Sequence, residues 1–348
     1  MLPTPMRTRY GARTMHVLIT GGSGFLGTLL ARRLLAADEL TVGGAAPAAL
    51  DRLTLVDLAP PAADVGADPR VRTLTGELGD LLGGLDPVDL VFHLAGVVSA
   101  AAEADYDLGM RTNVDATRLL LEHCRSLRTP PVLVFSSSLA VFGSDPAIGP
   151  VGTVDDDTLP RPQSSYGSQK FIGELLVADA TRRGFVRGRN VRLMTVAVRP
   201  GRPNAAASSF VSGIIREPLA GQRAVCPVPP ETPVALSSPR RTVDGLLLAA
   251  EADDQRWGST TAMNLPALST TPREMAAALD RVAGAGTSAL IDWSDDPAIG
   301  AIVRSWPSRF RTPRAEALGL RPESSFDDII RAYLADQADP VAGGPVRA

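Results

Sequence analysis

A tyrosine and a lysine, Tyr166 and Lys170, stand four residues apart in the segment SSYGSQK. Lys170 is the single lysine among 35 basic residues, so arginine occupies every other such position. Lysine is a compact charge on a flexible stem whose pKa shifts readily, whereas arginine is a rigid, permanently charged fork. Residues four apart on a helix share one face. The retained lysine therefore indicates a chemical role beside the phenol, although a surface Tyr–Lys pair fits the same spacing.

A glycine-rich segment, TGGSGFLG at 20–27, has the composition of a dinucleotide-binding loop. It follows an apolar stretch and precedes a helical pattern, which is the context that such a motif requires. Gly21 permits a tight turn, Gly24 lets the backbone approach a pyrophosphate, and Gly27 allows close contact between helix and sheet. The free N–H groups at the start of the helix attract an anion. A glycine-rich turn without a ligand is the alternative.

An acidic residue, Asp57, ends the apolar stretch LTLVD. A carboxylate at the end of the second strand of a dinucleotide fold binds the adenosine ribose and repels a 2′-phosphate, which favours NAD. Asp57 lies farther from the glycines than the usual spacing of about twenty residues. We expect the stretch Gly43–Ala49 to absorb the excess as a loop. A strand-end cap is the other interpretation, because Asp favours turns.

A run of serines, Ser136 to Ser138, begins where a predicted strand ends, in the segment FSSSLAVFG at 135–143. Ligands in open α/β sheets bind outside the carboxyl ends of the strands. A hydroxyl here could therefore face Tyr166 and Lys170 across a crevice. Serines also favour strand-to-loop turns for structural reasons alone.

Short apolar stretches typical of buried strands alternate with helical patterns over the first two hundred residues. The predicted strands are Met15–Thr20, Leu53–Asp57, Val88–His93, Pro131–Ser136 and Val191–Val198. The predicted helices between them include Phe25–Ala37, Asn113–Ser126 and Tyr166–Arg183. Such alternation indicates βαβ units and an α/β fold, a doubly wound parallel sheet of the Rossmann type.

The pattern changes after Arg199, where proline and glycine become frequent and Ala224–Pro239 reads as irregular. Helical patterns return at Thr242–Ala252, Pro272–Ala283 and Phe326–Ala335. We expect an NAD-binding domain at 15–198, to which 239–265 returns, and a smaller C-terminal substrate lobe at 199–238 and 266–336. Residues 1–14 are expected to be a disordered leader and 337–348 a disordered tail.

Composition excludes several classes of function. The 348 residues carry a net charge of −3 with a pI of about 5.7, so no broad basic field attracts nucleic acid. The two cysteines and three histidines are scattered along the sequence and predict no metal site. No apolar run approaches the roughly eighteen residues of a membrane span, and residues 1–14 lack the apolar core of a secretory signal. We therefore expect a cytoplasmic protein with a small-molecule substrate.

Together these motifs resemble the extended short-chain dehydrogenase/reductase family, also called the NAD-dependent epimerase/dehydratase family. The resemblance covers about residues 15–330, and it includes HLAG at 93–96, RTNVDA at 111–116, and Arg199-Pro200 at the family's Arg-Pro position. It implies that Tyr166 is the acid/base, that Lys170 lowers the pKa of this tyrosine and holds the nicotinamide ribose, and that Ser138 hydrogen-bonds the reacting oxygen. The implied NAD-binding residues are Gly21, Ser23, Gly24, Phe25, Leu26, Gly27, Asp57, Glu77, Leu78, Ala95, Asn113, Tyr166, Lys170, Arg199 and Pro200.

Two positions bear on the branch of the family. Its dehydratases carry an acid just after the catalytic serine, whereas Leu139 and Ala140 follow here, which argues against elimination. Its nucleotide-sugar epimerases usually carry Asn at the place of Arg202, and Arg can bind a carboxylate bidentately. The segment 199–241 is similar to that of members which oxidise a small sugar acid at C2. The implied substrate-binding residues are Ser138, Tyr166, Arg202, Asn204 and Arg241.

Alternatives remain at this point. Arg202, Arg216, Arg240 and Arg241 could each be solvated surface side chains. A nucleotide-sugar 4-epimerase would turn over UDP-sugars without net NADH, and a non-catalytic NAD-sensing protein would not need the Tyr166–Lys170 pair. The family resemblance also implies a homodimer formed through two helices per subunit, here at about 102–125 and 166–184.

Overall fold

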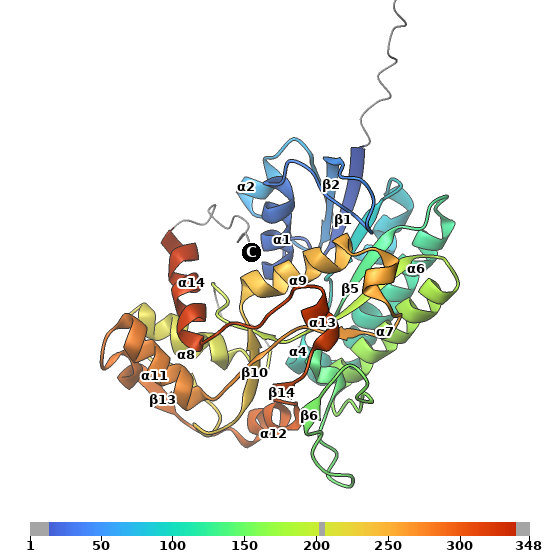
Figure 1. The fold of residues 1–348 in the computed structure, drawn as a ribbon. Helices are drawn as coiled ribbons and strands as arrows, with labels where there is room; N and C mark the ends of the chain where they lie inside the picture. The colour runs from blue at the N-terminus through green and yellow to red at the C-terminus, as the bar shows by residue number, and fades with distance from the viewer. Residues whose placement is uncertain (1–13, 202–205, 339–348) are drawn as a thin grey trace, which may run out of the picture.

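A seven-stranded sheet forms the centre of the computed structural model, which describes residues 14–201 and 206–338 (Figure 1). The strand order is β11-β7-β5-β4-β1-β2-β3, and every neighbouring pair is parallel. Its strands are β1 (Thr14–Thr20), β2 (Ala49–Asp57), β3 (Val71–Thr75), β4 (Leu90–His93), β5 (Val132–Ser138), β7 (Arg187–Leu193) and β11 (Met263–Asn264). The strands after β1 are added first on one side, as β2 and β3, and then on the other side, beginning with β4. Open α/β sheets bind ligands at such a switch point, here between β1 and β4. The doubly wound parallel sheet predicted from the sequence is confirmed.

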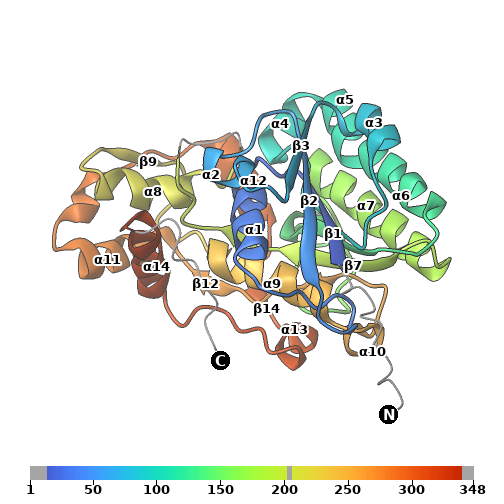
Figure 2. The same cartoon turned by 90° about the horizontal axis from the view of Figure 1, so that it is seen from above.

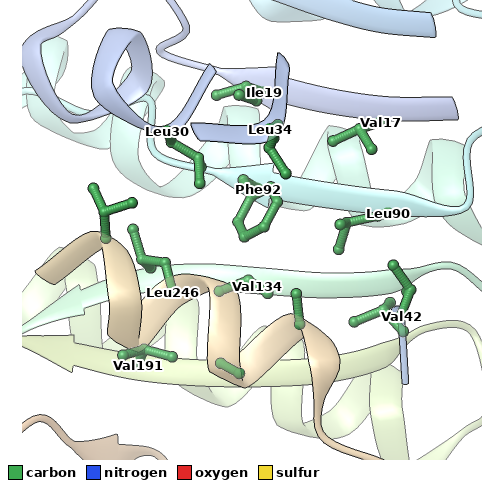
Figure 3. Close-up of a cluster of buried hydrophobic side chains, with 14 of the residues drawn as sticks. Val17, Ile19, Leu30, Leu34, Val42, Leu90, Phe92, Val134, Val191 and Leu246 are labelled. Carbon is green, nitrogen blue, oxygen red and sulfur yellow. The ribbon is translucent and has the colours of Figure 1, made fainter. Parts of the chain in front are cut away.

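Helices cover both faces of this sheet because successive strand residues point to opposite sides. On one face Val17, Ile19 and Phe92 pack against α1 (Phe25–Leu35) and α9 (Pro239–Glu251) through Leu30, Leu34 and Leu246 (Figure 3). On the other face Leu18, Val91 and Leu133 pack against α3 (Leu78–Leu81), α6 (Ala116–Ser126) and α7 (Ser165–Arg182). Apolar contacts on both faces hold the carboxyl edge of the sheet in a defined shape.

A smaller lobe lies beside the sheet and has its own apolar core. Figure 2 shows α8 (Phe210–Leu219), α11 (Pro272–Ala283) and α14 (Phe326–Ala338) gathered on the side away from α3 and α6. Ile214, Leu279 and Ile330 belong to this second core. The lobe's strands include β8 (Thr195–Val196), β9 (Ala224–Cys226), β10 (Val234–Ser237), β12 (Leu268–Thr270) and β13 (Ile291–Trp293).

The remaining elements are short. They are α2 (Ala63–Gly66), α4 (Ser99–Ala104), α5 (Tyr106–Gly109), α10 (Asp254–Trp257), α12 (Pro297–Ser305), α13 (Pro313–Ala317), β6 (Thr153–Val154), β14 (Arg309–Phe310), three 3-10 turns at 82–84, 139–141 and 287–290, and a π-helical segment at 110–115. No helix in the described part of the chain is long and apolar enough to cross a membrane.

Several elements differ from the prediction. The segment Ala224–Pro239 is not irregular, because it contains β9 and β10, which pair with β13, β8 and β12. β7 begins at Arg187, four residues before the predicted strand. The prediction missed its first residues because Arg189 and Asn190 are polar, although each is only 2% exposed. β3 was not predicted.

The ends of the chain also differ slightly from expectation. β1 already starts at Thr14, and α14 continues to Ala338, so both elements extend into the segments expected to be disordered. Residues 1–13 and 339–348 lie outside the described residues. The segment 239–265 supplies α9, which packs on the main sheet, and β11, which pairs with β7.

Candidate active site

A cleft of about 480 Å³ opens at the carboxyl edge of the sheet, between the sheet and the smaller lobe. The sheet side contributes the glycine loop after β1, the serines at the end of β5, and Tyr166 and Lys170 from α7. The lobe side contributes Arg199, Arg216 and Trp306. The cleft therefore joins residues that the sequence spreads over almost three hundred positions.

The glycine loop has the shape of a phosphate cradle. Gly21 has φ +72°, and a Cβ there would lie 2.7 Å from the backbone nitrogen of Ala95. A Cβ at Gly27 would collide with the carbonyl oxygen of Gly21. Helix α1 begins after Gly24 without any side-chain cap, so the N–H groups of its first turn are free for an anion. These features fit the pyrophosphate of a dinucleotide.

Asp57 lies beside this loop at the end of β2. Its Oδ2 accepts from the backbone N–H of Ser23 at 3.0 Å, and its Oδ1 accepts from that of Leu58 at 2.7 Å. A carboxylate offers about four lone-pair sites, so capacity remains for ribose hydroxyls. The extra length before Asp57 is taken up by turns at Gly43 and Gly44, which have φ +57° and +72°. Asp57 thus caps the strand end beside the glycine loop, and it is not among the residues that line the cleft.

Tyr166 and Lys170 lie on one face of α7, whose N-terminus is capped by the hydroxyl of Ser164. Lys170 is 3% exposed, and its Nζ lies 5.0 Å from the ring centroid of Phe135 and 5.9 Å from that of Tyr166. Burial lowers the pKa of Lys170 to about 8. The single lysine of the chain is therefore inside the cleft and not on the surface.

The pKa of Tyr166 reflects different neighbours from those expected. Burial raises this pKa, whereas interaction with the Ser138 hydroxyl and with the Arg199 charge lowers it. Arg199 is thus a cation that lowers the pKa of Tyr166 in this structure.

Asn113 holds the loop beneath Lys170 in place. It lies in the π-helical segment Met110–Asp115 and bonds Val97 twice, at 2.9 Å to the backbone N–H and at 3.1 Å to the carbonyl. Its amide also donates to Oε1 of Gln169 at 2.8 Å. A Cβ at Gly96 would lie 2.9 Å from Asn113 Oδ1 and 3.3 Å from Lys170 Nζ. Asn113 therefore supports the site, and it does not line the cleft itself.

A buried ion pair lies one helical turn beyond Lys170. Glu174 accepts from Nε and Nη2 of Arg192 at 2.8 and 2.7 Å, and from the hydroxyl of Ser137 at 2.5 Å. The two charged side chains are 5% and 3% exposed. The pair connects α7, β5 and β7 directly next to Ser138. The sequence analysis missed it, although Glu174 follows Tyr166 and Lys170 at helical spacing on the same face.

The other residues expected at the site are distributed as follows. Phe25, Leu26, Arg199 and Pro200 line the cleft, and Ala95 packs on Gly21. Glu77 is exposed and Leu78 is buried at the start of α3, and neither lines the cleft. Arg241 is exposed on α9 and is also outside the cleft wall. Arg202 and Asn204 lie outside the described residues.

Sequence reasoning underrated Arg216. It was one of four candidate arginines, and no helix was predicted around it, because Gly213 and Pro218 obscure the helical pattern of α8. The amphipathic spacing of Phe210, Ile214 and Ile215 was the signal that could have placed it on a helix.

The chain belongs to the NAD-dependent epimerase/dehydratase family, whose sequence model matches residues 17–236. This match confirms the resemblance drawn from the motifs. The protein is therefore an NAD-dependent oxidoreductase, and the family uses an NAD-type cofactor. The chain is 52% identical to the D-erythronate dehydrogenase of Cupriavidus necator, over 92% of this chain and 98% of that protein. It is 43% identical to the D-erythronate dehydrogenase of Haemophilus influenzae, over 92% and 99%. The segment 199–241 had already suggested this enzyme.

Among solved structures, the nucleoside-diphosphate-sugar epimerase of Agrobacterium tumefaciens matches with a TM-score of 0.83 and 38% identity, covering 97% of each chain. The L-threonine 3-dehydrogenase of Trypanosoma brucei matches with a TM-score of 0.78 and 25% identity, covering 95% of this chain and 99% of that one. The relatives therefore include both dehydrogenases and an epimerase.

Proposed function

We propose that the enzyme oxidises the C2 hydroxyl of a small sugar acid with NAD, and that D-erythronate, giving 2-dehydro-D-erythronate, is the substrate. The observation that carries this proposal is the cleft, in which Ser138, Tyr166 and Lys170 stand between the glycine loop and two lobe arginines. The two D-erythronate dehydrogenases that match almost the whole chain support the choice of substrate.

The residues of the cleft divide the work. The phenolate of Tyr166 accepts the proton of the C2 hydroxyl, which the hydroxyl of Ser138 holds in position. A bound NAD would supply the hydride acceptor for the same carbon. Nζ of Lys170, with a pKa of about 8, can hold or release a proton within the ordinary working range of pH.

The residues that would hold NAD follow from the fit of the cleft. The N-terminus of α1 and the loop at Gly21–Gly24 suit the pyrophosphate, and Asp57 suits the adenosine ribose. Lys170 is buried and lines the same wall of the cleft, so its ammonium group suits a contact with the nicotinamide ribose.

A nucleotide-sugar epimerase is the second candidate, because the solved relative from Agrobacterium tumefaciens carries that description. A spectrophotometric screen separates the two. The purified protein with NAD should produce NADH with D-erythronate and related four- to six-carbon sugar acids. Turnover of UDP-sugars without net NADH, together with no NADH from any sugar acid, would overturn the proposal.

Asp57 should determine the preference for NAD over NADP. We expect Asp57→Ala to weaken NADH binding about tenfold or more, because a hydrogen bond to a charged group contributes about 1.5–3 kcal/mol. NADPH binding should change little or improve, because the carboxylate that repels the 2′-phosphate is gone. Direct titrations with NADH and NADPH measure both constants without turnover. Asp64, an exposed acid that pairs with Arg32, provides the control variant Asp64→Ala. Equal binding of both cofactors by the wild type would contradict the assignment.

We also propose a cytoplasmic homodimer. Tyr106 on α5 and Leu175 on α7 are 60% and 56% exposed, and the two helices contact each other. This apolar surface coincides with the helices through which the family resemblance implies dimerisation.

A further inference from the structure

Two arginines in the described part of the chain line the lobe side of the cleft. Arg199 follows β8, and Arg216 lies in the last turn of α8. Nη1 of Arg216 donates to the carbonyl oxygen of Arg199 at 2.8 Å, so the two residues are adjacent. Both residues line the same cleft, and the charge of Arg216, after the larger effect of burial, lowers the pKa of Arg199.

The described residues do not fully neutralise these two cations. Nη2 of Arg216 bonds Oε1 of Glu217 at 2.5 Å, and its side chain is only 12% exposed. Arg199 makes no ion pair with any described residue. Two guanidinium groups and one carboxylate leave one excess positive charge in a partly desolvated wall. Such a charge is costly unless a ligand carries the opposite sign.

We infer that Arg199 and Arg216 form a carboxylate-binding subsite, and that Arg216 selects substrates with a carboxylate next to the reacting carbon. This inference rests on the proposed oxidation of a sugar acid. In such a substrate the carboxylate is one bond from the carbon that carries the C2 hydroxyl. Its cation must therefore lie beside Tyr166, where the charge of Arg199 already acts. A guanidinium pairs with a carboxylate in a fork geometry with two parallel bonds.

Arg216 is the cleaner of the two residues to test. Arg199 acts on the phenol, so its removal would change both proton transfer and binding. Arg216 bonds the backbone carbonyl of Arg199, and no part of the proposed proton transfer is assigned to it. The pyrophosphate of NAD is provided for on the opposite wall, at the start of α1, so the two arginines remain available for the substrate.

The first experiment compares D-erythronate with its uncharged analogue erythritol in the NAD-linked assay. Arg216→Gln should raise KM for D-erythronate about ten- to a hundredfold, with kcat and the use of erythritol little changed. Arg216→Lys should restore part of the affinity, because it returns the charge without the fork. The matched control is Arg223→Gln, which removes a surface arginine of the same lobe that pairs with Asp292. An unchanged KM in Arg216→Gln would overturn the subsite.

The second experiment needs no turnover. Malonate, a carboxylate without a hydroxyl, is titrated calorimetrically into the protein–NADH complex, and UDP is titrated in parallel. Arg216→Gln should weaken malonate binding at least about tenfold, and Arg223→Gln should not. Weakened UDP binding with unaltered malonate binding would show that the arginines recognise a diphosphate, which refutes the subsite. Malonate binding that depends on Arg216, without oxidation of D-erythronate by the wild type, would refute the proposed function and keep the subsite.

Discussion

Tyr166→Phe is expected to lower kcat about 10²–10⁴-fold, because a positioned general acid or base contributes about that much. The variant loses one hydroxyl and keeps the ring beside Lys170, so NADH should still bind with unchanged affinity. Steady-state oxidation of D-erythronate and a direct NADH titration measure the two effects separately. Tyr106→Phe is the matched control, since Tyr106 lies outside the cleft and the change keeps the apolar ring at the proposed dimer surface.

The pH profile provides a second test of the same role. Oxidation requires the phenolate, so kcat of the wild type should rise with pH until Tyr166 is deprotonated. Burial moves that rise to higher pH, whereas Ser138 and Arg199 move it to lower pH. The residual activity of Tyr166→Phe should lack this dependence. If the variant kept more than about a tenth of the wild-type kcat, Tyr166 would not be the general base, because that loss is smaller than such groups supply.

Glu174→Gln should cost about 3–5 kcal/mol of unfolding free energy, because it leaves the Arg192 guanidinium buried without its counter-charge. Arg192 is 3% exposed, so bulk solvent does not replace the lost carboxylate. Ser137, whose hydroxyl donates to Glu174, would lose its charged partner as well. Urea denaturation followed by circular dichroism measures the change.

The matched control for this variant is Glu122→Gln, which breaks the exposed pair between Arg118 and Glu122 on α6. Exposed helical pairs contribute about 0.3–0.5 kcal/mol, so this control should change little. The double variant Glu174→Leu/Arg192→Met should recover much of the lost stability, because replacing both members of a buried ion pair by apolar groups is often neutral or stabilising. Equal losses in Glu174→Gln and Glu122→Gln would show that the buried pair is not needed for stability.

The sequence alone determined the class of fold and the position of the cofactor loop. Runs such as Met15–Thr20 and Leu53–Asp57 are apolar because both faces of a central parallel strand are covered, and that requirement is visible locally. The loop at Gly21, Gly24 and Gly27 could be predicted for the same reason, because the backbone constraints that require glycine arise within a single turn. The lone Lys170 at helical spacing from Tyr166 indicated a helix that faces the cleft, and both residues line it.

The short strands of the lobe could not be read from the sequence. β8 pairs with β10 across about forty residues, and β6 pairs with β14 across more than one hundred and fifty. A strand of two or three residues has no periodicity of its own, and it forms because a distant partner satisfies its backbone groups. The predicted start of β7 was wrong for a related reason. Arg189 can be buried in this strand because Asp254, which is distant in the sequence, pairs with it.

The electrostatics of the site were decided by the tertiary structure. The sequence does not show that Glu174 and Arg192 meet, and the packing of α7 on β5 and β7 makes them a buried pair. The sequence predicted Arg202 as a substrate-binding residue, and Arg202 lies outside the described residues. Within the described residues the fold brings Arg216 of α8 next to Arg199. Charges act through distances in space, and a linear sequence does not contain those distances. The sequence therefore predicted residue types that line this cleft, and the tertiary structure determined which charged side chains surround them.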